Sequence, residues 1–270
     1  MKLIDKSNAK WKLTKLASWG AAAVFACAST AQAAPILVNG GFETTTPITA
    51  GAINGELGTN LNATGWNLAT NIYNNGYHVD LIFNSGANAI AGVNAPPLGT
   101  VNLLGVTNSP SGGNFAAVDA DETFGVPIWT NVTGLTVGQV YTVTFDFGAA
   151  QFVGAGQVGG TQSLNWAVSL GGNPYDCRGV TSAACQHSAN AVTTASGGFS
   201  GWKSASLNFT ATATSQALNF LAVGPTGFPP FLLLDNVQIS QPVPEPASIM
   251  LLGTGLVGLG RFARKRMRKS

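Results

Sequence analysis

Two segments near the middle of the chain alternate strictly between two kinds of side chain. In residues 141–147, aromatic residues and valine occupy the odd positions, and threonines and an aspartate occupy the even ones. Residues 163–170 repeat the pattern, with leucine, tryptophan and valine at every even position. Successive side chains of a β-strand point to opposite faces, so this period predicts strands with one face turned toward a core.

Further segments between residues 35 and 240 have the same character, and none has the period of an amphipathic helix. Turns rich in glycine and asparagine separate these segments, and neither a repeat nor an internal linker interrupts them. The series predicts an all-β fold, a single two-sheet antiparallel sandwich over residues 34–241. The other expected strands are 36–42, 78–83, 114–118, 128–132, 202–211, 217–223 and 231–239.

Charge is distributed very unevenly along the chain. The formal net charge is +2, but most of the 13 basic residues lie before residue 16 or after residue 260. Between residues 34 and 241, only Arg178 and Lys203 are basic, against nine acidic residues, a net charge of −7. This acidic middle argues against nucleic acid or anionic lipid as an electrostatic partner of the domain.

Residues 1–33 have the features of a secretory signal peptide. A lysine-bearing start precedes an apolar stretch over 16–28, and Ala31-Gln32-Ala33 fits the small-x-small rule for cleavage. The stretch is too short to cross comfortably a hydrocarbon core of roughly 30 Å, although an uncleaved N-terminal anchor is the alternative. We expect export through the Sec machinery and removal of the signal by signal peptidase.

The C-terminal residues 242–270 fall into three parts. Pro242, Pro244 and Pro246 hold an extended segment, because proline fixes its own φ and disfavours helix at the preceding residue. The uncharged run 247–260 would span about 21 Å as a helix, which predicts a short membrane segment. The basic residues that follow would stay cytoplasmic and leave Glu245 on the outer side.

This tail resembles the PEP-CTERM sorting signal in the order of its motif, apolar run and basic end. The resemblance implies recognition of Val243, Pro244, Glu245 and Pro246 by an exosortase-like membrane transpeptidase, which would remove the tail. It also implies a stay at the inner membrane, followed by release to the cell surface or extracellular matrix. A plain single-pass anchor is the alternative, but it leaves the Pro-Glu-Pro motif unexplained.

Short motifs in the middle of the chain resemble jelly-roll sandwiches related to galactose-binding domains and carbohydrate-binding modules. They are Asn39-Gly40-Gly41-Phe42-Glu43, Gly65-Trp66, the segment 114–119 and the closing segment 233–239. The resemblance implies first and last strands that lie near each other, and a structural Ca²⁺ held by Glu43 and Asp235. Hydrogen-bonded or solvated carboxylates are the alternative, because two acids alone do not define a calcium site.

The cysteines predict one disulfide. Cys27 leaves with the signal peptide, so the mature chain keeps Cys177 and Cys185, and an even pair in an exported protein favours a bridge. A zinc site that includes His187 is the alternative, but such a site needs three or four ligands.

Catalytic chemistry has little support in the sequence, and we expect no enzyme. Asp119, Asp121 and Glu122 could supply a carboxylate pair for glycoside hydrolysis, but their position directly after a strand predicts an exposed acidic turn. Neither His78 nor His187 belongs to a nucleophile motif.

Aromatic side chains in or beside expected loops are the remaining candidates for binding. Flat rings stack on the apolar faces of sugars, so Trp66, Tyr73, Tyr77 and Trp129 are the candidate glycan-binding residues. Packing in the core is the alternative for each of these rings. We therefore expect a non-catalytic exported protein that associates with extracellular polysaccharide. A purely structural matrix or adhesion protein and, less favoured, a glycan-active enzyme are the alternatives.

Overall fold

The structure is a computed structural model. It describes residues 34–50, 52, 55–70, 78–84, 93–95, 99–101, 103, 105–121, 123–151, 160–188, 192–194, 198–226, 230–241 and 255. Contacts between Cα atoms place Ala33–Val243 in one unit, which holds all the strands of the described residues. The expected signal peptide, residues 1–33, lies outside the described residues.

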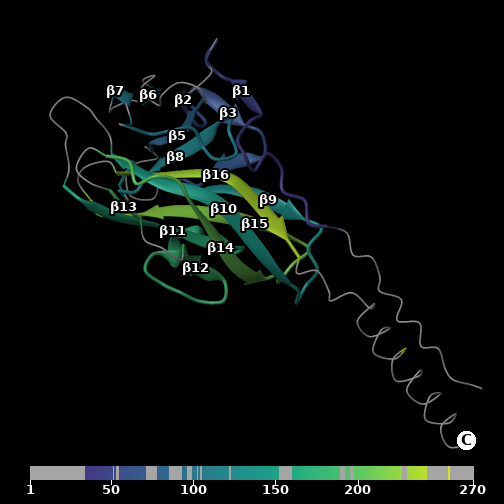
Figure 1. The fold of residues 1–270 in the computed structure, drawn as a ribbon. Coiled ribbons are helices and arrows are strands. Elements are labelled where there is room, and N and C mark those ends of the chain that lie inside the picture. Colours follow the sequence, from purple (N-terminus) through teal and green to yellow (C-terminus); the bar gives the residue numbers. More distant parts are fainter. Residues whose placement is uncertain are drawn as a thin grey trace, which may run out of the picture. The chain divides into compact units, whose positions relative to one another are not determined.

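The described strands form two large antiparallel sheets, which Figure 1 shows as two layers. The first sheet has the order β14 (Lys203–Thr210), β10 (Val140–Gln151), β16 (Pro230–Ser240), β8 (Phe115–Asp119), β5 (Asp80–Phe83) and β2 (Gly55–Glu56). The second has the order β12 (Cys185–His187), β11 (Gln162–Leu170), β15 (Ser215–Val223), β9 (Ile128–Thr133) and β4 (Trp66–Leu68), and β13 (Val192–Thr194) also pairs with β11. The predicted two-sheet sandwich is confirmed.

Short elements complete the described structure. β1 (Thr45–Pro47) pairs with β3 (Leu61–Ala63), and β6 (Val93–Ala95) pairs with β7 (Gly99–Val101). A single 3₁₀ turn, η1 (Pro174–Cys177), follows β11.

The main core lies between the two sheets and follows from the alternating pattern. The inward residues of β10 and β11 are fully or almost fully buried, whereas Thr142 and Thr144 on the other face of β10 are half-buried. Phe145 of the first sheet meets Phe220 of the second edge to face, with ring centroids 5.2 Å apart. Trp166 Nε1 donates to the Leu233 carbonyl at 3.2 Å, so a hydrogen bond also joins the layers. This satisfies the one polar atom of a fully buried ring.

A second apolar cluster covers the outer face of the first sheet. Phe231 and Leu233 of β16 point into it, while Leu232 and Leu234 point into the main core. Val101 and Leu103, from segments outside the sheet, pack onto the same face and are fully buried. Residues 231–234 of β16 are therefore apolar on both faces, since both are covered.

One strand prediction, residues 36–42, was wrong. Only Ile36 forms a β-bridge, to Thr133 of β9. Asn39 and Phe42 have φ values of 56° and 57°, in the left-handed region, and two such residues interrupt the extended backbone that a strand over 36–42 would need. The segment still runs beside the last strand, because Val237 N donates to the Gly40 carbonyl at 2.9 Å.

Candidate functional site

The outer face of the second sheet carries a row of polar and aromatic side chains. β9 buries alternate residues in the core, so half-buried Trp129 lies on the outer face. In the strand register, Trp129 pairs with Asn67 of β4 on one side and Asn219 of β15 on the other. Asn219 pairs with Ser169 of β11, and its Nδ2 donates to the Ser169 hydroxyl at 3.1 Å. The register thus aligns four neighbouring strands, and we call these four residues the Trp129 row.

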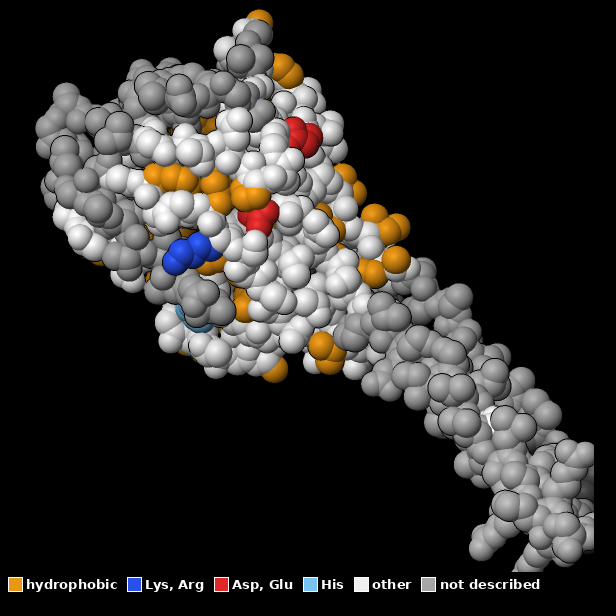
Figure 2. Space-filling model, viewed as in Figure 1, with side chains coloured by type: hydrophobic (Ala, Val, Ile, Leu, Met, Phe, Trp, Pro, Cys, Tyr) orange, Lys and Arg blue, Asp and Glu red, His pale blue; other side chains and the backbone are white. Residues whose placement is uncertain are grey.

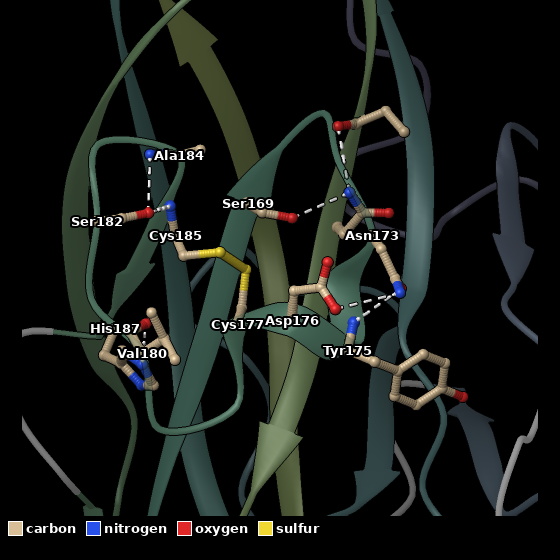
Figure 3. Close-up of a disulfide and its surroundings, with 12 residues drawn as sticks. Ser169, Asn173, Tyr175, Asp176, Cys177, Val180, Ser182, Ala184, Cys185 and His187 are labelled. Carbon is tan, nitrogen blue, oxygen red and sulfur yellow. Dashed lines mark hydrogen bonds between the residues drawn. A yellow bond between two sulfur atoms is a disulfide. The ribbon is translucent and has the colours of Figure 1, made fainter.

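The predicted disulfide lies at one end of this row, where Cys185 pairs with Ser169. Figure 3 shows the bond between Cys177 and Cys185, whose Cα atoms are 5.3 Å apart, so this prediction is confirmed. Both sulfurs are bonded to each other, which excludes them as thiolate ligands of zinc. The Cys177–Cys185 bridge packs on Ala167 and Leu221, on the outer face of the same sheet.

His187 forms hydrogen bonds to the protein through both ring nitrogens, so neither nitrogen is available to a metal ion. Its Nδ1 accepts a hydrogen bond from Asn165 Nδ2 at 2.6 Å, and its Nε2 donates to the Val180 carbonyl at 3.1 Å. His187 therefore attaches the disulfide loop to β11, and both of its ring nitrogens are occupied.

Tyr175 is a second aromatic residue on this side of the sandwich, and the sequence analysis missed it. Asn173 caps η1 by accepting a hydrogen bond from Tyr175 N at 3.1 Å. η1 contacts β11 and β15, and the Tyr175 hydroxyl donates to the Thr70 carbonyl at 2.9 Å, just beyond β4. β9 lies between β15 and β4, so Tyr175 and Trp129 share one region. The Asn-Pro-Tyr-Asp turn before Cys177 was the signal available in the sequence.

The other aromatic candidates have different outcomes. Trp66 as a glycan-stacking ring was wrong: it is 5% exposed, packs on Phe42 with ring centroids 4.5 Å apart, and donates from Nε1 to the Asn39 carbonyl at 2.8 Å. Trp66 begins β4 on the inward face of that strand, so the core takes the ring. Tyr73 and Tyr77 lie outside the described residues.

Glu43 and Asp235 lie close together. A Cβ atom built on Gly41 would lie 3.5 Å from Asp235 Oδ1 and 3.8 Å from Glu43 Oε1. Glu43 Oε1 accepts from Asn114 N at 3.0 Å, and a Cβ on Gly113 would collide with the Glu43 carboxylate. Gly41 and Gly113 have no Cβ, and the carboxylates of Asp235 and Glu43 lie in or beside the space that a Cβ would fill.

Burial raises the pKa of Asp235 to about 6. Hydrogen bonds from Ser109, Ser111 and the Asn236 amide oppose this shift, and the charge of Glu43 adds to it. Asn236 N donates to Asp235 Oδ1 at 2.6 Å, and the Asn236 side chain donates to buried Asp146 at 3.0 Å. Asn236 adopts φ 51°, so a left-handed residue connects the two aspartates.

The donor set around Asp235 fits a hard cation. The available atoms are carboxylate oxygens of Glu43 and Asp235 and hydroxyl oxygens of Ser109 and Ser111, and Ca²⁺ prefers oxygen ligands. Burial and the nearby Glu43 charge both disfavour the ionised form of Asp235, and a bound cation would favour it. In the part of the chain that the structure describes, no group of three or more His, Cys, Asp or Glu residues could hold a metal ion, so carbonyl oxygens and water would have to complete the shell.

The prediction of an exposed acidic turn after residue 118 was wrong. Asp119 is fully buried and Asp121 is 4% exposed, while Glu122 lies outside the described residues. Asp119 Oδ1 accepts from Asp121 N at 2.8 Å, and Asp121 Oδ1 accepts from Thr123 N at 2.9 Å. Burial raises the pKa of Asp119 well above its usual value, and the charges of Asp121 and Asp80 add to the shift. These carboxylates shape a buried turn.

A histidine and two acids lie together beside this turn. His78 Nδ1 lies 3.3 Å from Asp80 Oδ2 and 3.6 Å from Glu56 Oε1. Burial raises the pKa of Asp80 to about 6, and it also raises the pKa of Glu56. Burial lowers the pKa of His78, but Asp80 and Glu56 together outweigh that effect and raise it. The group joins β2 and β5 at the edge of the first sheet.

The expected sorting tail, residues 242–270, lies outside the described residues except for Gly255. Within the described ranges, the structure has no helix long and apolar enough to cross a membrane. Residues 242–266 match the PEP-CTERM protein-sorting motif. The chain carries a PEP-CTERM sorting motif. The match contains Val243, Pro244, Glu245 and Pro246.

Several solved structures are similar to the chain in fold. A CBM61 module in complex with β-1,4-galactotriose has 15% identity and a TM-score of 0.34, over 76% of this chain and 97% of that one. An adhesin domain of Lys-gingipain from Porphyromonas gingivalis has 13% identity and a TM-score of 0.36, over 75% and 96%. The CBM22-1 xylan-binding domain from Paenibacillus barcinonensis has 14% identity and a TM-score of 0.35, over 78% and 97%. No curated protein sequence matches the chain.

Proposed function

We propose that this protein is exported, held at the inner membrane by its tail, and cleaved there by an exosortase-type transpeptidase for release to the cell surface or matrix. The PEP-CTERM match over residues 242–266 carries this proposal. The alternating prolines keep Glu245 in an extended segment that a protease cleft can accept. The apolar run and basic end would position that segment outside the membrane.

The sandwich, in this proposal, is a non-catalytic module that binds a glycan on the outer face of the second sheet. The Trp129 row supports this assignment, because it places the half-buried Trp129 ring beside the exposed side chain of Asn67, while the buried Asn219 and Ser169 support the ring from the other side. An indole face packs on the apolar C–H face of a sugar ring. Amide groups both donate and accept hydrogen bonds, as sugar hydroxyl groups do. Tyr175 adds a second aromatic side chain on the same side.

The expected ligand is a neutral polysaccharide. The Trp129 row contains an indole, two amides and a hydroxyl, and none of these side chains carries a charge. Residues 34–241 carry a net charge of −7, which would repel an acidic polymer. On the face drawn in Figure 2, charged side chains are isolated and most of the described surface is uncharged.

Binding of the processed, exported protein to immobilised extracellular polysaccharides tests this function. Trp129→Ala should weaken binding about tenfold, equivalent to about 1.4 kcal/mol. The matched control is Trp202→Ala, because Trp202 is also half-buried but packs edge to face on Phe115, on the outer face of the first sheet. The control should retain binding once its folding has been verified by circular dichroism.

Two results would contradict the glycan site. If wild type and Trp129→Ala bind polysaccharide with equal affinity, the Trp129 row does not contact the glycan. A wild-type protein that binds no polysaccharide would favour the structural matrix protein without a sugar site.

A further inference from the structure

Both chain ends of the sandwich leave it from the same end. Ile36 bridges to Thr133, the last residue of β9, and their backbone groups exchange hydrogen bonds of 2.9 and 3.1 Å. Ser240, the last residue of β16, pairs with Thr142 near the start of β10. Because β9 ends where β10 begins, across the 134–139 turn, the segments leading to residues 33 and 242 leave from one side.

Exposed aliphatic side chains surround this end. Val137 is 60% exposed, Ile36 59%, Val38 44% and Val140 41%. We call these four residues the rim. Figure 2 shows hydrophobic side chains at the right edge of the described surface, in the region where β9 and β16 end in Figure 1. Such side chains are normally scattered singly on a monomer, so their gathering at one end is informative.

The backbone that presents the rim is held firmly. The hydroxyl of fully buried Tyr141 accepts a hydrogen bond from Thr136 N at 2.9 Å. Gly138 N donates to the Ala211 carbonyl at 2.8 Å, and Leu135 N donates to the Thr214 carbonyl at 3.1 Å. Val137 therefore projects from a fixed turn, and its exposure does not depend on a change in that turn.

The same end contains no charged residue. Residues 34–38, 132–142, 207–215 and 238–241 contain no Asp, Glu, Lys, Arg or His. Contact with an apolar phase would therefore bury no ionised group at this end, which is the largest cost of such a contact.

We propose that the rim rests on the lipid surface of the inner membrane while the tail is inserted. The inference depends on the proposed sorting tail. Residues 241–246 separate the last strand from the apolar run, and they reach at most about 20 Å when fully extended. The tether thus keeps this end beside the bilayer, and the rim would set the direction in which the Pro-Glu-Pro segment is presented. Contact is apolar, so it needs no anionic lipid.

The test uses the chain from Ala34 to Ser270, which keeps its tail and its disulfide but lacks the apolar stretch 16–28, reconstituted in phosphatidylcholine vesicles. In this chain, Val137→Cys is labelled with the polarity-sensitive fluorophore NBD. The matched control is Ile48→Cys, because Ile48 is 51% exposed and its backbone pairs with Asn60, away from the rim. We expect a blue-shifted emission and protection from a water-soluble quencher at position 137 only, and loss of both when Val140→Glu is added.

The outcomes separate the two proposals. Flotation of the protein with vesicles reports insertion of the tail. Flotation with a position-137 label that stays as exposed to water as position 48 overturns the rim contact and leaves the tail proposal intact. Protection that increases with the number of protein molecules per vesicle indicates a second copy and also overturns the lipid assignment. Failure to float overturns both proposals.

Discussion

The carboxylates of Glu43 and Asp235 both lie beside Gly41, although Glu43 precedes the first strand and Asp235 belongs to the last. A residue with a Cβ at Gly41 would sit 3.5 Å from Asp235 Oδ1, and the carboxylates raise each other's energy when both are ionised. This proximity joins the two ends of the folded chain. We propose that a calcium ion binds between them.

Calcium should stabilise the folded protein through these two carboxylates. An ion that binds only the folded state adds about 2.7 kcal/mol at a hundredfold excess over its dissociation constant. We expect chelation to lower the melting temperature of the wild type by several degrees, and Asp235→Asn to remove that sensitivity. Exposed Asp176→Asn is the matched control and should keep it. If neither calcium nor chelator changes the melting temperature of the wild type, Glu43 and Asp235 bind no calcium and are only hydrogen-bonded carboxylates.

Stability without calcium should fall as pH rises from about 4 to about 6. Folding raises the pKa of Asp235 and of Asp80 to about 6 in each case, so the folded state binds protons more tightly than the unfolded state. Their stabilising protons are fully present below about 4, the usual aspartate pKa, and are lost as pH passes through about 6. Denaturant unfolding measured at several pH values between about 4 and 6 should show a free energy of unfolding that falls with pH. Asp235→Asn should reduce the slope of that fall, and an unchanged slope would contradict the raised pKa of Asp235.

The disulfide should stabilise the sandwich and its glycan-binding face together. Cys177 and Cys185 have a sequence separation of 8. Closing so short a loop contributes about 2.6 kcal/mol on the chain-entropy estimate. Cys177→Ser/Cys185→Ser should therefore lower the denaturation midpoint, and it should weaken polysaccharide binding because η1 and Tyr175 lose their attachment. Reduction of the wild type should reproduce both effects. A double variant with unchanged binding would show that the loop plays no part in the site.

The exported protein should lack both of its ends. If the expected signal peptide and the sorting motif are both processed, intact-mass measurement of material outside the cell should give a start near Ala34 and an end near Pro244. Changing both Pro244 and Pro246 to alanine should leave the tail uncleaved and the protein in the inner membrane. Full-length wild-type protein recovered outside that membrane would contradict this prediction.

Local pattern predicted most of the sandwich. The alternation in 141–147 and 163–170 placed β10 and β11, because burial of one face imposes period two on any half-buried strand. The cysteine pair predicted its own bridge, since only two cysteines follow the expected signal peptide. The order of prolines, apolar run and basic residues predicted the sorting motif, which a processing enzyme reads as linear sequence.

Long-range packing decided the rest. Trp66 and Trp129 look alike in sequence, yet Trp66 fills the core against Phe42 while Trp129 faces outward. Asp119 stands where the sequence predicted an exposed turn, but it is the last residue of β8, pairs with Phe231 of the distant strand β16 and is fully buried. Whether a side chain is exposed depends on what packs over it, and that neighbour has no fixed spacing in the sequence. Sequence alone therefore determined most of the long strands, the disulfide and the sorting motif. Only the tertiary structure brought Glu43 to Asp235 and aligned Trp129 with Asn67, because strand register places residues from distant segments side by side.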